Sequence, residues 1–76
     1  MEGQIYFGRI GSYNDKEGNT NYTIDYMSDT GVTHRDKISQ KMYNHLKTLE
    51  LNPCQVVNAI FEVDIFNKIT LVDITL

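Results

Sequence analysis

The feature that most limits what this chain can fold into is the apolar residue at every second position over 55–65, QVVNAIFEVDI. Successive side chains of a strand point to opposite faces, so this alternation indicates a strand with one apolar face. That face consists of Val57, Ala59, Phe61, Val63 and Ile65. We predict a turn over 66–68, with Asn67 in the left-handed conformation, and a last strand over 69–75 that completes a hairpin.

Three further strands are predicted in the first half of the chain, over 4–13, 20–27 and 32–37. The second of them alternates cleanly, which indicates that its large side chains face the core. These side chains are Tyr22, Ile24 and Tyr26. The first strand contains Gly8 and Gly11, and glycine inside a strand often marks a bulge or a sharp bend.

The spacing of apolar residues changes over 39–51, where they recur every three or four positions. This spacing is typical of one face of a helix. The face consists of Ile38, Met42, Leu46 and Leu49. Ser39 is a suitable N-cap, and Asn52 with Pro53 is expected to end the helix.

The resulting order is three strands, one helix and two strands. This order resembles that of the OB-fold, a five-stranded Greek-key barrel, and the resemblance extends to the chain length and to the glycines of the first strand. It implies a mostly β fold, namely a five-stranded OB-like barrel with one helix between strands three and four. The alternatives are an SH3-like barrel and an α+β sheet with one packed helix. Residues 1–76 are expected to form a single small domain.

Composition and motifs remove several classes of function. The single cysteine excludes an internal disulfide, and Cys54, His34 and His45 lack the number and spacing of zinc ligands. No phosphate-binding glycine loop and no nucleophile motif occurs. We therefore expect no catalytic residue, no metal, no cofactor and no enzymatic activity. Without an apolar stretch of roughly 20 residues or a signal-peptide pattern, we expect a cytoplasmic protein that does not enter membranes.

Two candidate chemical sites have simpler interpretations. Cys54 could pair with a histidine base, but it follows Pro53 at the start of a strand, where a buried small apolar residue is common. We interpret Cys54 as structural. Glu62 and Asp64 lie two residues apart, so they share one face of a strand at a separation of about 7 Å. Because the opposite face is apolar, we interpret both carboxylates as solvated rather than as a metal or acid–base pair.

Charge and aromatic residues suggest a binding surface. The formal net charge is −3, which disfavours strong non-specific binding to nucleic acid. Cations nevertheless gather between His34 and Lys47, where Asp36 is the only acid. OB domains that bind single strands combine exposed aromatic rings with a basic groove, and aromatic residues are frequent in the first two predicted strands. The candidate ligand-binding residues are Tyr6, Arg9, Tyr13, Arg35, Lys37 and Lys41.

Two functional hypotheses follow. The first is a non-enzymatic module that binds single-stranded DNA or RNA through an OB-type face. The second is a protein-binding adaptor or inhibitor that presents an acidic surface to a basic partner protein. That surface would consist of Asp15, Glu17, Asp25, Asp29, Glu62 and Asp64. The last strand also offers an apolar edge, so the second hypothesis includes a homodimer formed through this strand.

Overall fold

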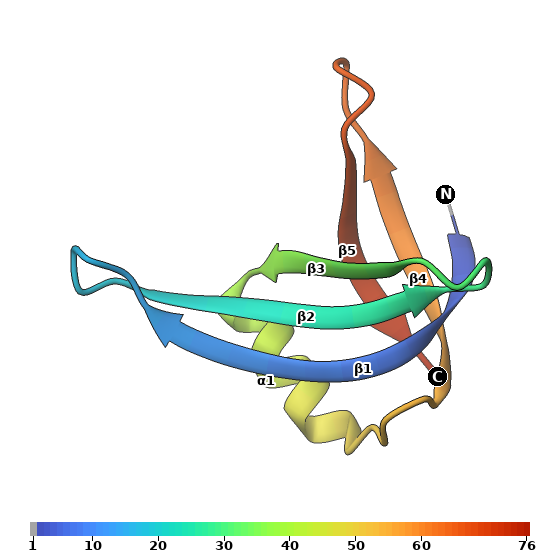
Figure 1. Cartoon of the computed structure of the whole chain (residues 1–76), viewed down its shortest axis with the longest axis horizontal. Coiled ribbons are helices and arrows are strands. Elements are labelled where there is room, and N and C mark those ends of the chain that lie inside the picture. The colour runs from blue at the N-terminus through green and yellow to red at the C-terminus, as the bar shows by residue number, and fades with distance from the viewer. Residues whose placement is uncertain (1) are drawn as a thin grey trace.

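Five antiparallel strands form one sheet, and a single helix packs against it. The computed structural model describes residues 2–76. Its elements are β1 (Glu2–Asn14), β2 (Thr20–Ser28), β3 (Thr33–Ile38), α1 (Gln40–Leu49), β4 (Val56–Val63) and β5 (Ile69–Thr75). The strands are arranged in the order β3-β2-β1-β4-β5 (Figure 1). The mostly β fold, and the position of the helix between strands three and four, are therefore confirmed.

The sheet is curved but does not close into a barrel, which corrects the sequence-based expectation. Within the described residues, β3 and β5 are the two ends of the sheet. Neighbouring strands are rotated relative to one another by the twist of the sheet. As a result β3 crosses β5 and touches it without running beside it (Figure 1). An open seam therefore separates the two strands, and Arg35, Lys37, Lys68 and Thr70 are among the residues that line it.

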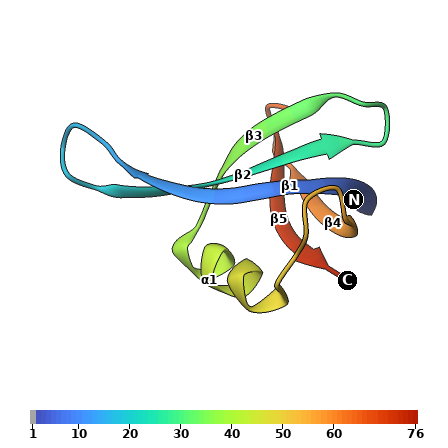
Figure 2. The ribbon, with the colours of Figure 1, turned by 60° about the horizontal axis from the view of Figure 1, so that its bottom comes forward.

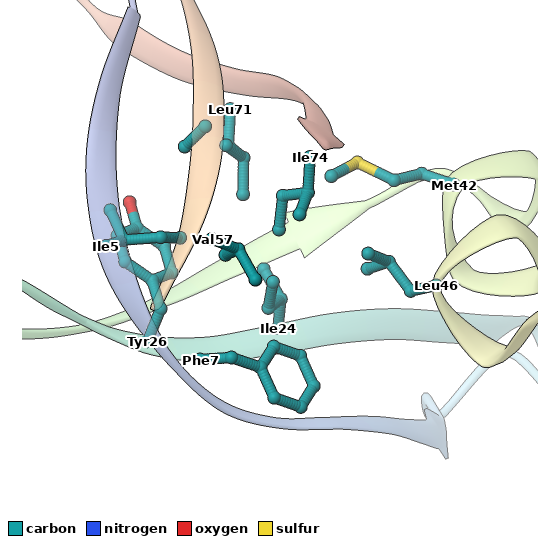
Figure 3. Close-up of a cluster of buried hydrophobic side chains, with 10 residues drawn as sticks. Ile5, Phe7, Ile24, Tyr26, Met42, Leu46, Val57, Leu71 and Ile74 are labelled. Carbon is teal, nitrogen blue, oxygen red and sulfur yellow. The ribbon is translucent and has the colours of Figure 1, made fainter. Parts of the chain in front are cut away.

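The core lies between the inner face of the sheet and α1, which covers the sheet from below in Figure 2. Its buried residues are Ile5, Phe7, Ile24, Tyr26, Met42, Leu46, Val57, Ala59, Leu71 and Ile74. Met42 and Leu46 extend from α1 toward Ile24 and Ile74 (Figure 3). The predicted apolar face of the helix is thus confirmed. Tyr22 also faces α1, where its ring centroid lies 4.6 Å from that of Tyr43.

The helix begins as predicted and ends earlier. The side chain of Ser39 accepts a hydrogen bond from the backbone amide three residues later, at 3.1 Å, and so caps the helix. The helix ends at Leu49 because Glu50 adopts the left-handed conformation, with φ 51°. Asn52 and Pro53 therefore lie in the connection to β4, and the prediction that they end the helix is wrong. No helix in the described part of the chain has the length and apolar character needed to cross a membrane.

A bulge at Gly8 interrupts the pairing of β1 with β2. The residues on either side of it, Phe7 and Arg9, pair with consecutive residues of β2. An extra residue in one strand shifts the alternation of its side chains. Tyr6 and Arg9 are consequently both on the outer face, whereas Phe7 is buried. A Cβ atom on Gly8 would lie 2.6 Å from the carbonyl oxygen of Asp25, so the close approach of the two strands requires glycine here.

The β4–β5 hairpin has a tightly hydrogen-bonded turn. The Oδ1 atom of Asp64 accepts hydrogen bonds from the amides of Phe66 and Lys68, at 2.8 and 2.9 Å. Asn67 adopts the left-handed conformation, with φ 60°, as predicted. Because Asp64 belongs to this turn, β4 ends at Val63, earlier than the predicted strand over 55–65. Asp64 is therefore a turn-capping residue and not a strand residue beside Glu62.

The apolar face of β4 is continuous in sequence but only half of it is buried. Val57 and Ala59 are buried, and Phe61 is partly buried against the core. Val63 and Ile65 are exposed. The alternation identified the strand correctly, but the hairpin extends past the core, so its far half has no covering layer among the described residues (Figure 1).

Candidate functional site

The outer face of β1, β2 and β3 brings together five of the six candidate residues. These are Tyr6, Arg9, Tyr13, Arg35 and Lys37. The pairing register places Arg9, Asp25 and Arg35 in one row across the three strands. The bulge brings Tyr6 to one side of this row. On the other side lie Lys37 and, farther along, Tyr13 near the β1–β2 turn.

Asp25 lies between the two arginines and binds both. Arg35 Nε donates to Asp25 Oδ1 at 2.7 Å, and Arg9 Nε donates to Asp25 Oδ2 at 3.0 Å. The hydrogen bonds from Arg35 and then from Arg9 hold the pKa of the Asp25 carboxyl below its usual value. A guanidinium group has five N–H donors, so each arginine keeps donors that Asp25 does not use. The row is therefore an exposed array of two oriented guanidinium groups around one carboxylate.

A shallow groove lies beside this row. Its lining includes Tyr6, Asp25, Met27, Thr33, Arg35 and Cys54. Cys54 is exposed, which corrects the expectation that it is buried. It lies in the connection before β4 with φ 67°, and its amide donates to the carbonyl oxygen of Phe7 at 2.7 Å. This backbone hydrogen bond fixes the residue at the edge of the groove, outside the core.

Lys41 lies apart from the outer face. It belongs to α1 and lines a recess beside Asp73 of β5. The chain leaves β3 and turns at once into α1, which packs on the inner side of the sheet (Figure 2). Closeness in sequence to Arg35 and Lys37 therefore does not become closeness in space.

An aromatic cluster lies on the inner side of the same strands. The hydroxyl of Tyr26 donates to Asp36 Oδ2 at 2.7 Å. The ring of Tyr26 stacks on that of His34, with centroids 5.1 Å apart, and meets Phe61 at 6.4 Å. Burial, and then the hydrogen bond to Asp36, raise the pKa of Tyr26 above its ordinary value. These residues line a second groove, between the ends of β1, β2 and β3 and the base of the β4–β5 hairpin.

The raised pKa of Tyr26 is expected to make stability fall at alkaline pH. Above about pH 10, the ordinary tyrosine pKa, Tyr26 loses its proton in the unfolded chain but keeps it in the folded chain. The folded state then binds more protons, so the free energy of unfolding decreases as pH rises. Urea unfolding from about pH 9 to about pH 11 should show this decrease in the wild type and a smaller one in Tyr26→Phe. Equal slopes in the two proteins would contradict it.

Lys68 was not among the binding residues predicted from the sequence, although it adds a cation beside the outer face. This residue follows the β4–β5 turn and lines the open seam together with Arg35 and Lys37. No local pattern joins residues so distant in sequence, because only the pairing of the strands brings them together.

Within residues 2–76, no three His, Cys, Asp or Glu side chains form a group that could hold a metal ion.

Comparisons of the chain with protein-family models, with curated proteins and with solved structures give no match. What this chain binds is therefore inferred from the geometry and charge of its surface.

Proposed function

We propose that this chain is a non-enzymatic, OB-type module that binds single-stranded DNA or RNA across the outer face of β1, β2 and β3. The observation that carries the proposal is the row of Arg9, Asp25 and Arg35 with a tyrosine on either side, Tyr6 and Tyr13. Guanidinium groups bind phosphate, and exposed aromatic rings stack on bases. Both kinds of contact are tolerant of sequence, so a weak base preference is expected.

The local charge of the outer face supports this proposal, although the chain as a whole is acidic. The cations Arg9, Arg35 and Lys37 lie on this face around Asp25, with Asp15 near Lys37. Lys68 adds a fourth cation at the seam, which Asp36 also lines. A local basic surface can attract a polyanion even when the net charge is negative. The strand would therefore lie across the arginine row and reach the seam.

The acids predicted for a docking surface are partly occupied within the fold. Asp15 Oδ1 accepts hydrogen bonds from the amides of Glu17 and Asn19, at 3.0 and 2.9 Å. Asp64 caps the β4–β5 turn, and Asp25 binds the two arginines. These three carboxylates have clear structural roles, which favours the nucleic-acid proposal over an acidic adaptor surface.

Fluorescence anisotropy with labelled single-stranded oligonucleotides tests the proposal at about 50 mM and about 150 mM salt. Affinity should fall as salt rises. Arg35→Ala removes one phosphate contact, and at the higher salt this should weaken binding about fourfold, since each contact changes log K by about 0.7 times log of the salt concentration. Tyr13→Ala removes a stacking surface worth about 1 kcal/mol, or about fivefold. A wild-type protein that does not bind even at low salt would overturn the proposal.

Lys41→Ala is the matched control, because it removes a cation that lies away from the outer face. Binding should remain at the wild-type level. If Lys41→Ala weakens binding as much as Arg35→Ala does, the interaction depends on overall charge rather than on this face.

Cys54 gives an independent measure of where the strand lies. Its thiol is exposed beside Tyr6 and Arg35, so a bound oligonucleotide should slow its reaction with an aromatic disulfide reagent. An unchanged rate under saturating oligonucleotide would place the bound oligonucleotide elsewhere.

A free exposed thiol also fits a reducing compartment, and we further propose a cytoplasmic location.

A further inference from the structure

The far half of the β4–β5 hairpin, residues 61–71, is here named the arm. Phe61 pairs with Leu71, and Val63 pairs with Ile69. Residues directly opposite one another on paired strands share a face, so these four side chains form one apolar face. Leu71 is buried, and the apolar face therefore continues the core outward along the arm.

The outer part of this apolar face is exposed. Val63 is 50% exposed and Ile69 is 58% exposed, and at the turn Ile65 and Phe66 reach 91% and 82%. Figure 1 shows the arm standing clear of the rest of the sheet. Contiguous exposed apolar residues on a small domain mark an interaction surface.

The groove at the base of the arm has a complementary character. Its aromatic lining comes from Tyr26, His34 and Phe61. Its carboxylates come from Glu2, Asp29 and Asp36. Aromatic rings beside carboxylates favour a partner that carries an apolar group together with a cation. The end of the arm carries such a pair, because Phe66 and Lys68 lie two residues apart in its turn.

We propose that a second copy of this chain occupies the groove. In this two-fold symmetric dimer, the end of each arm lies in the groove of the other copy. The groove lies at the base of the arm, and Phe66 and Lys68 lie at its end. Two arms that pack antiparallel through their apolar faces therefore bring each end to the base of the other. Such a contact is self-complementary, as a two-fold interface requires.

Charge and geometry favour a second copy as the occupant. Lys68, the cation at the end of the arm, meets a groove whose charged residues are acidic. The two-fold symmetry repeats this contact between opposite charges, so it occurs twice in the dimer. The same packing covers Val63, Ile65, Phe66 and Ile69 in both copies. The groove lies on the inner side of the strands, whereas the arginine row lies on the outer face. Lys68 is the one residue used in both proposals, so Phe66→Ser and Asp29→Lys test the dimer without changing the proposed nucleic-acid surface.

Sedimentation velocity from about 1 µM to about 1 mM tests the dimer. The wild-type mass should rise from 8.8 kDa toward twice that value. Phe66→Ser should raise the dissociation constant at least about thirtyfold, because a buried aromatic anchor is a hot-spot residue. Val56→Ser is the matched control, since it removes a 49% exposed apolar side chain at the other end of β4, outside the arm and the groove, and should leave the dimer unchanged.

A charge exchange tests the reciprocal contact. Lys68→Glu and Asp29→Lys should each be monomeric alone, because each homodimer would bring like charges together twice. Mixed at equal concentration, they should form a heterodimer in which both arm–groove contacts again join opposite charges. Circular dichroism should show unchanged folds, since both side chains are exposed.

Three results would overturn the dimer. The first is a wild-type chain that stays monomeric at about 1 mM. The second is a dimer that Phe66→Ser leaves intact, which would place the interface elsewhere. The third is a pair of charge variants that fails to associate on mixing. In the first case, binding of the arm to vesicles of phosphatidylglycerol would assign the arm to a lipid surface.

Discussion

Gly8→Ala is expected to lower the free energy of unfolding by about 2–3 kcal/mol, within the range for inserting a methyl group where no space exists. The new Cβ atom would lie 2.6 Å from the carbonyl oxygen of Asp25 and 3.1 Å from the carbonyl carbon. These atoms belong to the backbone of β2, so relief requires β1 and β2 to move apart. A domain of this length is stable by only roughly 4–11 kcal/mol, and the substitution would remove a large part of that.

Gly3→Ala is the matched control for this prediction. Gly3 lies in the same strand, and a Cβ atom there would meet no atom within 4 Å. Its substitution should be neutral or stabilise the chain by about 0.4–1 kcal/mol, because alanine restricts the unfolded chain. Urea unfolding of the two variants and the wild type gives the comparison. If Gly8→Ala is as stable as Gly3→Ala, the bulge does not depend on glycine.

The elements and their inward faces could be predicted because they depend on local periodicity. The alternation in β2 correctly placed Ile24 and Tyr26 in the core, and the helical spacing placed Met42 and Leu46 there. The N-cap at Ser39 was likewise predictable, because it depends on the side chain of one residue and an amide three positions later.

The errors arose where long-range packing decides the outcome. The alternation of β4 predicts equal burial at Val57 and Val63, yet only Val57 has a covering layer. The closure of the sheet depends on the accumulated twist of all five strands, which no local pattern contains. Cys54 was expected to be buried from its position before a strand, but a left-handed backbone turns it outward.

The candidate site was predicted in part. The alternation of side chains along a strand predicted that Arg9 shares a face with Tyr13, and Arg35 with Lys37. It could not predict that the two pairs lie on one surface. The bulge at Gly8 added Tyr6 to the same face, and the register of β2 placed Asp25 between the arginines. Asp25 had been grouped with the acids of a docking surface. Because it binds both guanidinium groups, we expect instead that it competes with an anion for the two arginines.

Asp25→Asn is therefore expected to tighten binding of single-stranded nucleic acid by about fourfold at about 150 mM salt. The carboxylate competes with phosphate for both guanidinium groups, at 2.7 and 3.0 Å. Both arginines already contact phosphate in the proposed complex, so the substitution removes one opposing charge, an effect worth about one phosphate contact or about 0.7 log units per log unit of salt. The slope of log K against log salt should steepen by about 0.7 for the same reason. Exposed ion pairs contribute only about 0–1 kcal/mol, so the fold should persist.

Asp73→Asn separates this effect from a simple change in net charge. It removes the same single negative charge, but Asp73 lies on β5 beside Lys41, away from the outer face. Anisotropy titrations should show a clear gain for Asp25→Asn and little change for Asp73→Asn. Equal gains would mean that overall charge governs binding. Weaker binding by Asp25→Asn would mean that the carboxylate is needed to hold Arg9 and Arg35 in position, and the arginine row would then be a positioned pair that phosphate joins without displacing Asp25.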